Sequence, residues 1–132
     1  MNLFKNLATL LCVAFLLATS TANASEGGSK DSLNAKMEPI VVNLMGSEQQ
    51  VIRVELVLQL AKQEVSEIVK LYMPVIRHKM ILLLTSKDAN QLGSFEGKQR
   101  LVMESKNAIN QALGILDYEG VADVLFASFI IQ

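Results

Sequence analysis

The sequence has few of the residues that build disulfides and metal centres. Among its 132 residues there is one cysteine, Cys12, and one histidine, His78. Cys12 lies in an N-terminal segment that is expected to be cleaved, so the mature chain is expected to have neither a disulfide nor a thiol site. A single histidine with no cysteine beside it also lacks the ligand set that zinc requires. We therefore expect no metal site and no cofactor.

Neither sign of charge dominates the sequence. Twelve Lys and Arg residues face thirteen Asp and Glu residues, which gives a net charge of -1, and aromatic residues make up only 5% of the chain. No basic run occurs. Proteins that bind nucleic acids carry a cluster or stripe of positive charge, so we expect no nucleic-acid partner.

Residue types that perform catalysis occur here without the neighbours that catalysis needs. His78 lies between Arg77 and Lys79, whose positive charges disfavour a protonated imidazole. We predict that it is a surface residue of a helix. Glu64 and Glu67 are three residues apart, but no nucleophile, base or glycine-rich loop accompanies them. The sequence therefore predicts no catalytic residues and no enzyme activity.

Apolar residues are abundant, at 51% of the chain, and some of them form a targeting segment at the N-terminus. Lys5 is followed by an apolar run over residues 7–18, and Ala22 and Ala24 are the small residues that precede a cleavage site. The run is shorter than the about 20 apolar residues that span a membrane. We predict that residues 1–24 are a signal peptide, with an uncleaved membrane anchor as the alternative.

Residues 25–36 are polar and lack periodicity, which predicts a flexible linker. After it, residues 40–42 are β-branched and follow Pro39, and residues 51–60 alternate between apolar and polar side chains. Such alternation is typical of a half-buried antiparallel strand. We predict that the two segments pair as a hairpin and that the apolar face of the second strand forms the floor of the core.

The segment of residues 62–84 is predicted to form one long helix that contains a proline. Its apolar residues recur at steps of three and four, as on one face of a helix: Val65, Ile68, Val69, Tyr72, Ile76, Met80 and Leu83. Pro74 removes a backbone donor and costs roughly 3 kcal/mol inside a helix, so we predict a bend there that packing maintains. Residues 80–84 are apolar on all sides, which predicts their burial. Thr85 or Ser86 is expected to cap a short helix that starts near Asp88.

A last helix is predicted from Ser94, its N-cap, to Leu113, with Gly114 ending it. The final strand, residues 121–132, is apolar on both faces. Burial of both faces indicates either a central strand or an edge strand that another subunit covers. The sequence thus predicts an α+β fold: a small, mostly antiparallel sheet of about three strands, with the proline-bent helix and the last helix on one face.

The region from residue 73 to residue 101 resembles the C-terminal domain of the bacterial flagellar basal-body-associated FliL family. The matching residues are Met73, Pro74, Ile76, Arg77, Leu82, Leu83, Leu84, Ser86, Lys87, Leu92, Glu96, Gly97 and Lys98. The likeness extends over roughly residues 51–132. The family usually keeps an uncleaved membrane helix, from which this sequence departs, and often has proline where Phe95 stands.

The resemblance implies that residues 37–132 form a FliL-like domain, similar in shape to the stomatin-type domain, in the periplasm near the inner membrane. It implies a homo-oligomer, such as a ring, that associates with flagellar stator units or the basal body. The implied function is non-enzymatic support of motor torque in swimming or swarming, with chemotaxis depending on that motility. A periplasmic scaffold or chaperone-like oligomer unrelated to the flagellum is the alternative.

Arg77 and Lys87 match positions of the family and are candidate contacts with a partner or subunit. A planar guanidinium beside a helix bend suits a carboxylate on a neighbouring subunit, and an intramolecular salt bridge is the alternative. Phe129 and Ile131 of the final strand are the other candidate contacts. Structural roles are predicted for Pro74, Gly97 and Gly114.

Overall fold

The computed structural model describes residues 33–46 and 49–132, so the predicted signal peptide and most of the predicted linker lie outside the described residues. The described part is an α+β fold, as the sequence predicts. Its elements, in chain order, are β1 (Asn34–Lys36), β2 (Ile40–Asn43), β3 (Val51–Leu60), α2 (Val65–Thr85), α3 (Ala89–Gly93), α4 (Phe95–Leu113) and β4 (Val121–Ile131).

The sheet is built around β3, which pairs antiparallel with each of the other three described strands. The predicted hairpin of β2 and β3 is confirmed, with Ile40 opposite Val54. The sheet has a fourth strand, because Asn34–Lys36, at the end of the predicted linker, pairs with the second half of β3. In the described part of the chain β4 pairs with β3 alone, so the final strand lies at the edge of the sheet.

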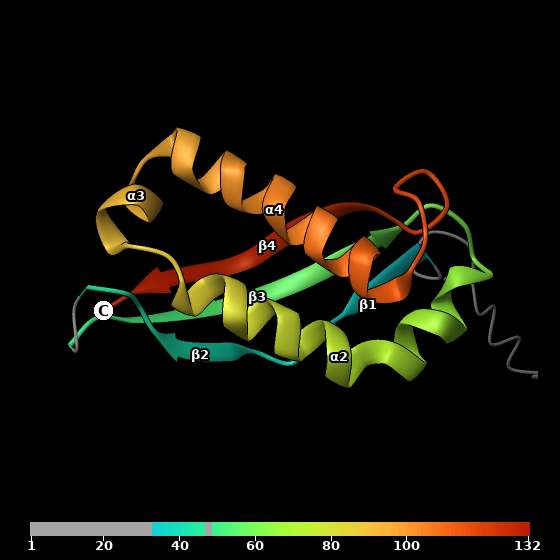
Figure 1. The fold of residues 1–132 in the computed structure, drawn as a ribbon, viewed down its shortest axis with the longest axis horizontal. Coiled ribbons are helices and arrows are strands. Elements are labelled where there is room, and N and C mark those ends of the chain that lie inside the picture. Colours follow the sequence, from blue (N-terminus) through green and yellow to red (C-terminus); the bar gives the residue numbers. More distant parts are fainter. Residues whose placement is uncertain (1–32, 47–48) are drawn as a thin grey trace, which may run out of the picture.

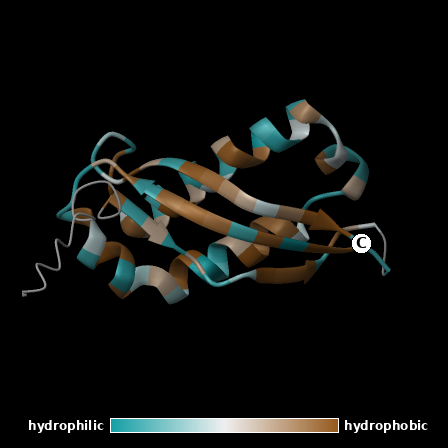
Figure 2. Cartoon of the chain, turned by 180° about the vertical axis from the view of Figure 1, so that it is seen from behind, coloured by the Kyte–Doolittle hydropathy of each residue, from teal (hydrophilic) through white to brown (hydrophobic). Residues whose placement is uncertain are grey.

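The helices α2 and α4 cover one face of the sheet, and the view from behind shows strands on the other face (Figures 1 and 2). The core lies between these layers. It includes the alternating residues of β3 that the sequence predicts as its floor: Ile52, Val54, Leu56, Leu58 and Leu60. Each of these side chains is at most 4% exposed, so the strand's alternation identified the buried face correctly.

Helix α2 contains Pro74 and changes direction near its middle (Figure 1). Its buried residues are Val65, Val69, Ile76, Met80 and Leu84. The predicted inner face was too wide, because Ile68 and Tyr72 are 40% and 39% exposed. The predicted burial of all of residues 80–84 was also wrong, since Leu82 is 52% exposed. The reason is that α2 lies on the surface of a two-layer domain, so only the side toward the sheet and α4 is covered.

The helix caps differ in part from the prediction. The hydroxyls of Thr85 and Ser86 donate back to carbonyls of α2 and do not cap α3. Asp88 caps α3 instead, because its carboxylate accepts a hydrogen bond from the Asn90 backbone N–H at 2.7 Å. Ser94 caps α4 as predicted, with its hydroxyl accepting from the Gly97 N–H at 3.0 Å.

Candidate functional site

Arg77, a predicted partner contact, binds within its own chain. Its guanidinium donates to the carbonyl oxygens of Glu38 and Pro39, at 2.9 Å in each case. These two residues precede β2, so Arg77 ties the middle of α2 to the segment between β1 and β2. This is neither a carboxylate pair with a subunit nor an internal salt bridge, and it occupies both ends of the planar group.

Lys87, the second predicted contact, forms an ion pair with Glu104 of α4. The two side chains are 18% and 34% exposed. Lys87 follows α2 directly, and its carbonyl also accepts a hydrogen bond from the Met45 N–H at 2.9 Å. Both predicted cations thus join elements of the fold to one another.

The side chains of Phe129 and Ile131, the other two predicted contacts, are half-buried on the helix-covered face of β4, where they pack against the core. The Phe129 ring meets the Phe126 ring edge to face, with centroids 5.5 Å apart. The Lys98 ammonium of α4 lies 5.4 Å from the centroid of the Phe129 ring, within the range of a cation–π interaction. The side chains themselves therefore contribute to the packing of α4 on β4.

The backbone of these two residues faces outward. Gln132 exchanges two hydrogen bonds with Val51 of β3, at 2.9 Å each. In an antiparallel pair the residues that point toward the neighbouring strand alternate, so the N–H and C=O groups of Phe129 and Ile131 point away from β3. No other described strand pairs there. The C-terminal half of β4 is thus an open edge that could accept another strand.

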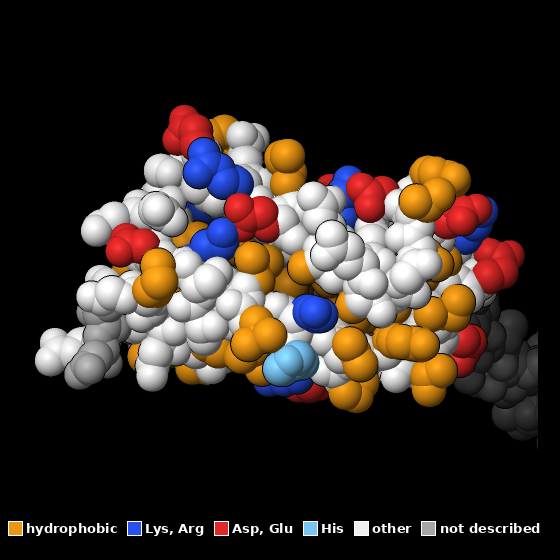
Figure 3. All heavy atoms as spheres, viewed as in Figure 1, with side chains coloured by type: hydrophobic (Ala, Val, Ile, Leu, Met, Phe, Trp, Pro, Cys, Tyr) orange, Lys and Arg blue, Asp and Glu red, His pale blue; other side chains and the backbone are white. Residues whose placement is uncertain are grey.

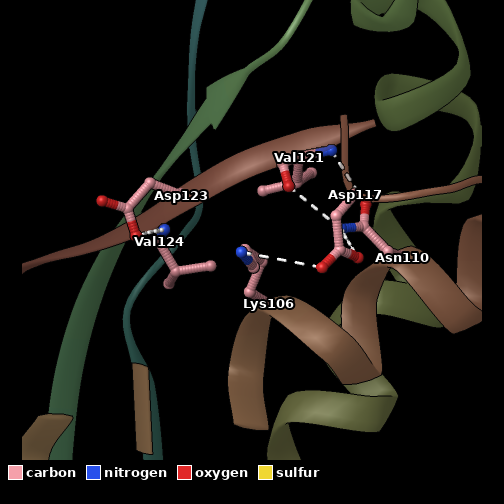
Figure 4. Close-up of polar contacts among 6 residues, drawn as sticks. All are labelled: Lys106, Asn110, Asp117, Val121, Asp123 and Val124. Atoms are coloured by element: carbon pink, nitrogen blue, oxygen red, sulfur yellow. Dashed lines mark hydrogen bonds and ion pairs between the residues drawn. The ribbon is translucent and has the colours of Figure 1, made fainter. Parts of the chain in front are cut away.

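Other parts of the described sheet's edges are partly covered. The pairing of β3 with β4 shifts register twice, between Glu55 and Leu56 and between Gln59 and Leu60, and such bulges disturb an edge. In the N-terminal half of β4 the Val124 N–H is occupied by the Asp123 carboxylate at 2.8 Å (Figure 4). The carbonyls that precede β2 are bound by Arg77. The last residues of β4 are therefore an open edge of the described sheet, and the short strand β2 forms the opposite one, where the Val41 N–H points away from β3.

The residues with predicted structural roles lie at restricted places. A Cβ at Gly97 would lie 1.7 Å from the Gln91 carbonyl oxygen, so no larger residue fits there without a backbone shift. Gly114 has φ +67° at the end of α4, a left-handed conformation that favours glycine. Pro74 is exposed, on the solvent side of α2, where a proline can bend a helix without disturbing the core.

A polar cluster joins the end of α4 to the start of β4 (Figure 4). The Asn110 side chain, which is 2% exposed, bonds the backbone of Val121 and the Asp117 carboxylate. Lys106 pairs with the same carboxylate at 3.6 Å. A hollow of about 370 Å³ lies beside this cluster, lined by Asn107, Asn110, Gln111 and Asp117 among others. The polar groups of Asn110, Asp117 and Lys106 bond one another or the Val121 backbone, which indicates that the cluster has a structural role.

His78, Glu64 and Glu67 are all exposed on or beside α2, and Glu67 pairs with Lys70 at 2.8 Å. Within residues 33–46 and 49–132, no three acidic, histidine or cysteine side chains are grouped so that they could hold a metal ion. None of the helices in this part combines the length and the apolar character needed to cross a membrane.

The surface that the sequence did not reveal is a hydrophobic stripe on the outer side of α2. It consists of Ile68, Leu71, Tyr72, Val75 and Leu82, which are 39–77% exposed. Figure 3 shows hydrophobic side chains along this helix on the helix-covered side of the molecule. The three- and four-residue spacing of these side chains could have indicated an apolar outer face of the helix. Ile68 and Tyr72 were instead assigned to the buried face because they follow the same three- and four-residue steps.

The fold and its surfaces define a small α+β domain that presents an apolar helix face and an open strand edge, both suited to protein contacts. The chain belongs to the FliL family: the family model described as "Flagellar basal body-associated protein FliL" matches residues 35–132. This range includes nearly all of the described residues.

Two relatives illustrate the similarity. The chain is 37% identical over 95 residues to the flagellar protein FliL of Aquifex aeolicus (strain VF5), covering 71% of this chain and 57% of that protein. It is 29% identical over 97 residues to the flagellar protein FliL of Escherichia coli (strain K12), covering 73% of this chain and 62% of that protein. The match therefore leaves more than a third of each relative uncovered.

Proposed function

We propose that this chain is a non-enzymatic accessory protein of the bacterial flagellar motor. It associates with the basal body or the stator units and supports the torque that drives swimming or swarming. The observation that carries this proposal is the family match over residues 35–132, which includes every helix of the described fold and its three longest strands. A scaffold or chaperone role apart from the flagellum has no comparable support, because the relatives are named as flagellar proteins.

The proposal places the domain in the periplasm, at the inner membrane, exported by its N-terminal segment. It also includes a homo-oligomer, such as a ring, as the FliL resemblance implies. Among the four predicted contact residues, Arg77 and Lys87 are engaged internally. Phe129 and Ile131 offer backbone groups that no other described strand pairs with, at the open edge of β4. We therefore assign the motor or subunit contact of this proposal to that edge.

The motor role is tested by deleting the gene without affecting its neighbours and measuring spreading in soft agar and swimming speed as the viscosity of the medium rises. A motor accessory should matter most under high load, so we expect the deletion strain to lose speed as viscosity increases. The complete chain supplied from a plasmid should restore it. Unchanged motility of the deletion strain at high load would contradict the proposal.

The strand edge is tested with Ile131→Pro. This change removes an N–H that points away from β3, so the pairing of β3 with β4 should survive while an added strand is disfavoured. Val41→Pro is the matched control, because the Val41 N–H points away from β3 at the opposite edge of the sheet. We expect Ile131→Pro to fail to complement the deletion and Val41→Pro to complement it. Equal complementation by both would exclude the β4 edge as the contact.

A further inference from the structure

The exposed apolar stripe on α2 can pair with a second copy of itself, because a negative and a positive side chain lie at its opposite ends. Along the outer side of the helix, Glu64 precedes Ile68, Leu71, Tyr72 and Val75, and Lys79 follows them; Leu82, the last residue of the stripe, lies beyond Lys79. The steps are three or four residues, as on one helix face, except that Leu71 and Tyr72 are consecutive and flank the line on its two sides. Glu64 directly precedes α2 and has helical φ and ψ of -61° and -24°, so its side chain continues the line of the helix.

We propose that a second copy of this chain covers the stripe, with the two α2 helices packed antiparallel around a two-fold axis between Leu71 and Tyr72. Such an axis places Ile68 opposite Val75 of the second copy. The same axis places Glu64 opposite Lys79 of the second copy, so each end of the apolar contact closes with an ion pair. Because the interface is isologous, each contact occurs twice.

The charges at the two ends support this arrangement. Glu64 and Lys79 are exposed, and neither forms an ion pair or a hydrogen bond with another side chain of residues 33–46 and 49–132. Glu67 and Lys70 on the same helix, by contrast, pair with each other at 2.8 Å. A parallel pairing of two α2 helices would set Glu64 against Glu64 and Lys79 against Lys79, so the charge pattern selects the antiparallel arrangement.

The apolar side chains of the stripe are also strongly exposed to solvent. Leu71, next to the proposed axis, is 77% exposed, and Val75 is 42% exposed. Contiguous exposed apolar residues with a charged rim are typical of protein contact surfaces. One pair of helices buries an area at the low end of specific interfaces, so the dimer should be reversible and depend on concentration.

The dimer is distinct from a ring and does not rest on the motor role. A two-fold contact closes on itself, whereas a ring of more than two copies needs a different, head-to-tail contact. The two surfaces lie on different elements, the outer side of α2 and the open edge of β4. A chain that stays monomeric in solution would therefore not contradict the proposed motor role. A deletion strain with normal motility would not contradict the dimer.

The test is a charge exchange on the purified full chain, read by sedimentation velocity over a range of concentrations. Glu64→Lys and Lys79→Glu should each weaken the dimer by roughly 10-fold or more in Kd, because each replaces two attractions by two repulsions. The double variant carrying both changes should regain association near that of the parent. Leu71→Asp should abolish the dimer over the same concentration range.

Lys70→Glu is the matched control for Lys79→Glu, since it makes the same charge change on the same helix at an exposed position on the side away from the stripe. It should associate as the parent does, and circular dichroism should show that all variants remain folded. The proposal is overturned if the parent is monomeric throughout, if the single exchanges associate as the parent does, or if the double variant shows no recovery. It is also overturned if only changes at the β4 edge alter the oligomer.

Discussion

Asn110 makes the two hydrogen bonds to Val121 that a neighbouring strand would make. Its side-chain N–H donates to the Val121 carbonyl at 2.9 Å, and its side-chain oxygen accepts from the Val121 N–H at 2.8 Å (Figure 4). Both residues are buried. The amide therefore joins the end of α4 to the first residue of β4 and satisfies backbone groups that the sheet leaves unpaired at that point.

Asn110→Ala should lower the free energy of unfolding by about 3 kcal/mol, because it leaves a buried N–H and a buried C=O without partners. Urea denaturation measures the change. Asn107→Ala, one turn earlier and exposed, should stay within about 0.5 kcal/mol of the parent. A similar small effect at both positions would show that water replaces the Asn110 amide without cost.

Gly97→Ala should destabilise the protein by about 3 kcal/mol, because the new methyl group would collide with the Gln91 carbonyl oxygen and force α3 away from α4. Gly93→Ala provides the control, since a Cβ there meets nothing within 4 Å. We expect Gly93→Ala to be neutral or slightly stabilising. Thermal melting of the two variants checks the contrast, and equal melting temperatures would contradict it.

Lys87→Met should cost about 2 kcal/mol, because it leaves the Glu104 carboxylate partly buried without its cation. The cost is below that of a fully buried pair, since the two side chains keep some exposure to water. Lys70→Met removes a cation from the exposed pair with Glu67 and should change stability by less than about 0.5 kcal/mol. Denaturant titration of the two variants separates these outcomes.

Pro74→Ala should lower the melting temperature and alter assembly, although helix propensity alone favours alanine by roughly 3 kcal/mol. A straighter α2 would move Arg77 from the carbonyls of Glu38 and Pro39, which it now binds at 2.9 Å. Calorimetry and sedimentation velocity measure the two effects. A variant that melts no lower and assembles as the parent does would show that the proline is merely tolerated.

Export should remove the first 24 residues and leave 132 − 24 = 108 residues. Mass spectrometry of the N-terminus of protein isolated from cells tests this prediction. We expect a chain that begins at Ser25. An intact N-terminus including Lys5, recovered from membranes, would establish the anchored form instead.

The regular elements were predictable because their signals are local. The alternation in β3 identified its buried face, and Ser94 and Gly114 marked the ends of α4. β1 was missed because three residues carry no periodicity, and only pairing with β3 defines them as a strand. The cap of α3 was misplaced because Thr85, Ser86 and Asp88 all have suitable side chains, and the exact end of α2 decides among them.

The candidate contact residues show the limit of local signals most clearly. For Arg77 and Lys87 the sequence left a partner contact and an intramolecular salt bridge open, because it does not show which carbonyl or carboxylate lies beside a cation. The fold brings Glu38 and Pro39 to Arg77, and Glu104 to Lys87, from distant parts of the chain. Phe129 and Ile131 expose backbone groups rather than side chains, and this depends on the register with β3.

The sequence by itself determined the class of fold, the central strand's buried face and the position of the proline in the long helix, because periodicity and propensity act over a few residues. Only the tertiary structure decided which side of α2 is covered. An apolar residue every three or four positions fits either side of a surface helix, and the sheet and α4 occupy only one. The opposite side of α2, which includes Glu64 and Lys79, is identified as a solvent-exposed surface only because the structure shows which residues of the helix are buried.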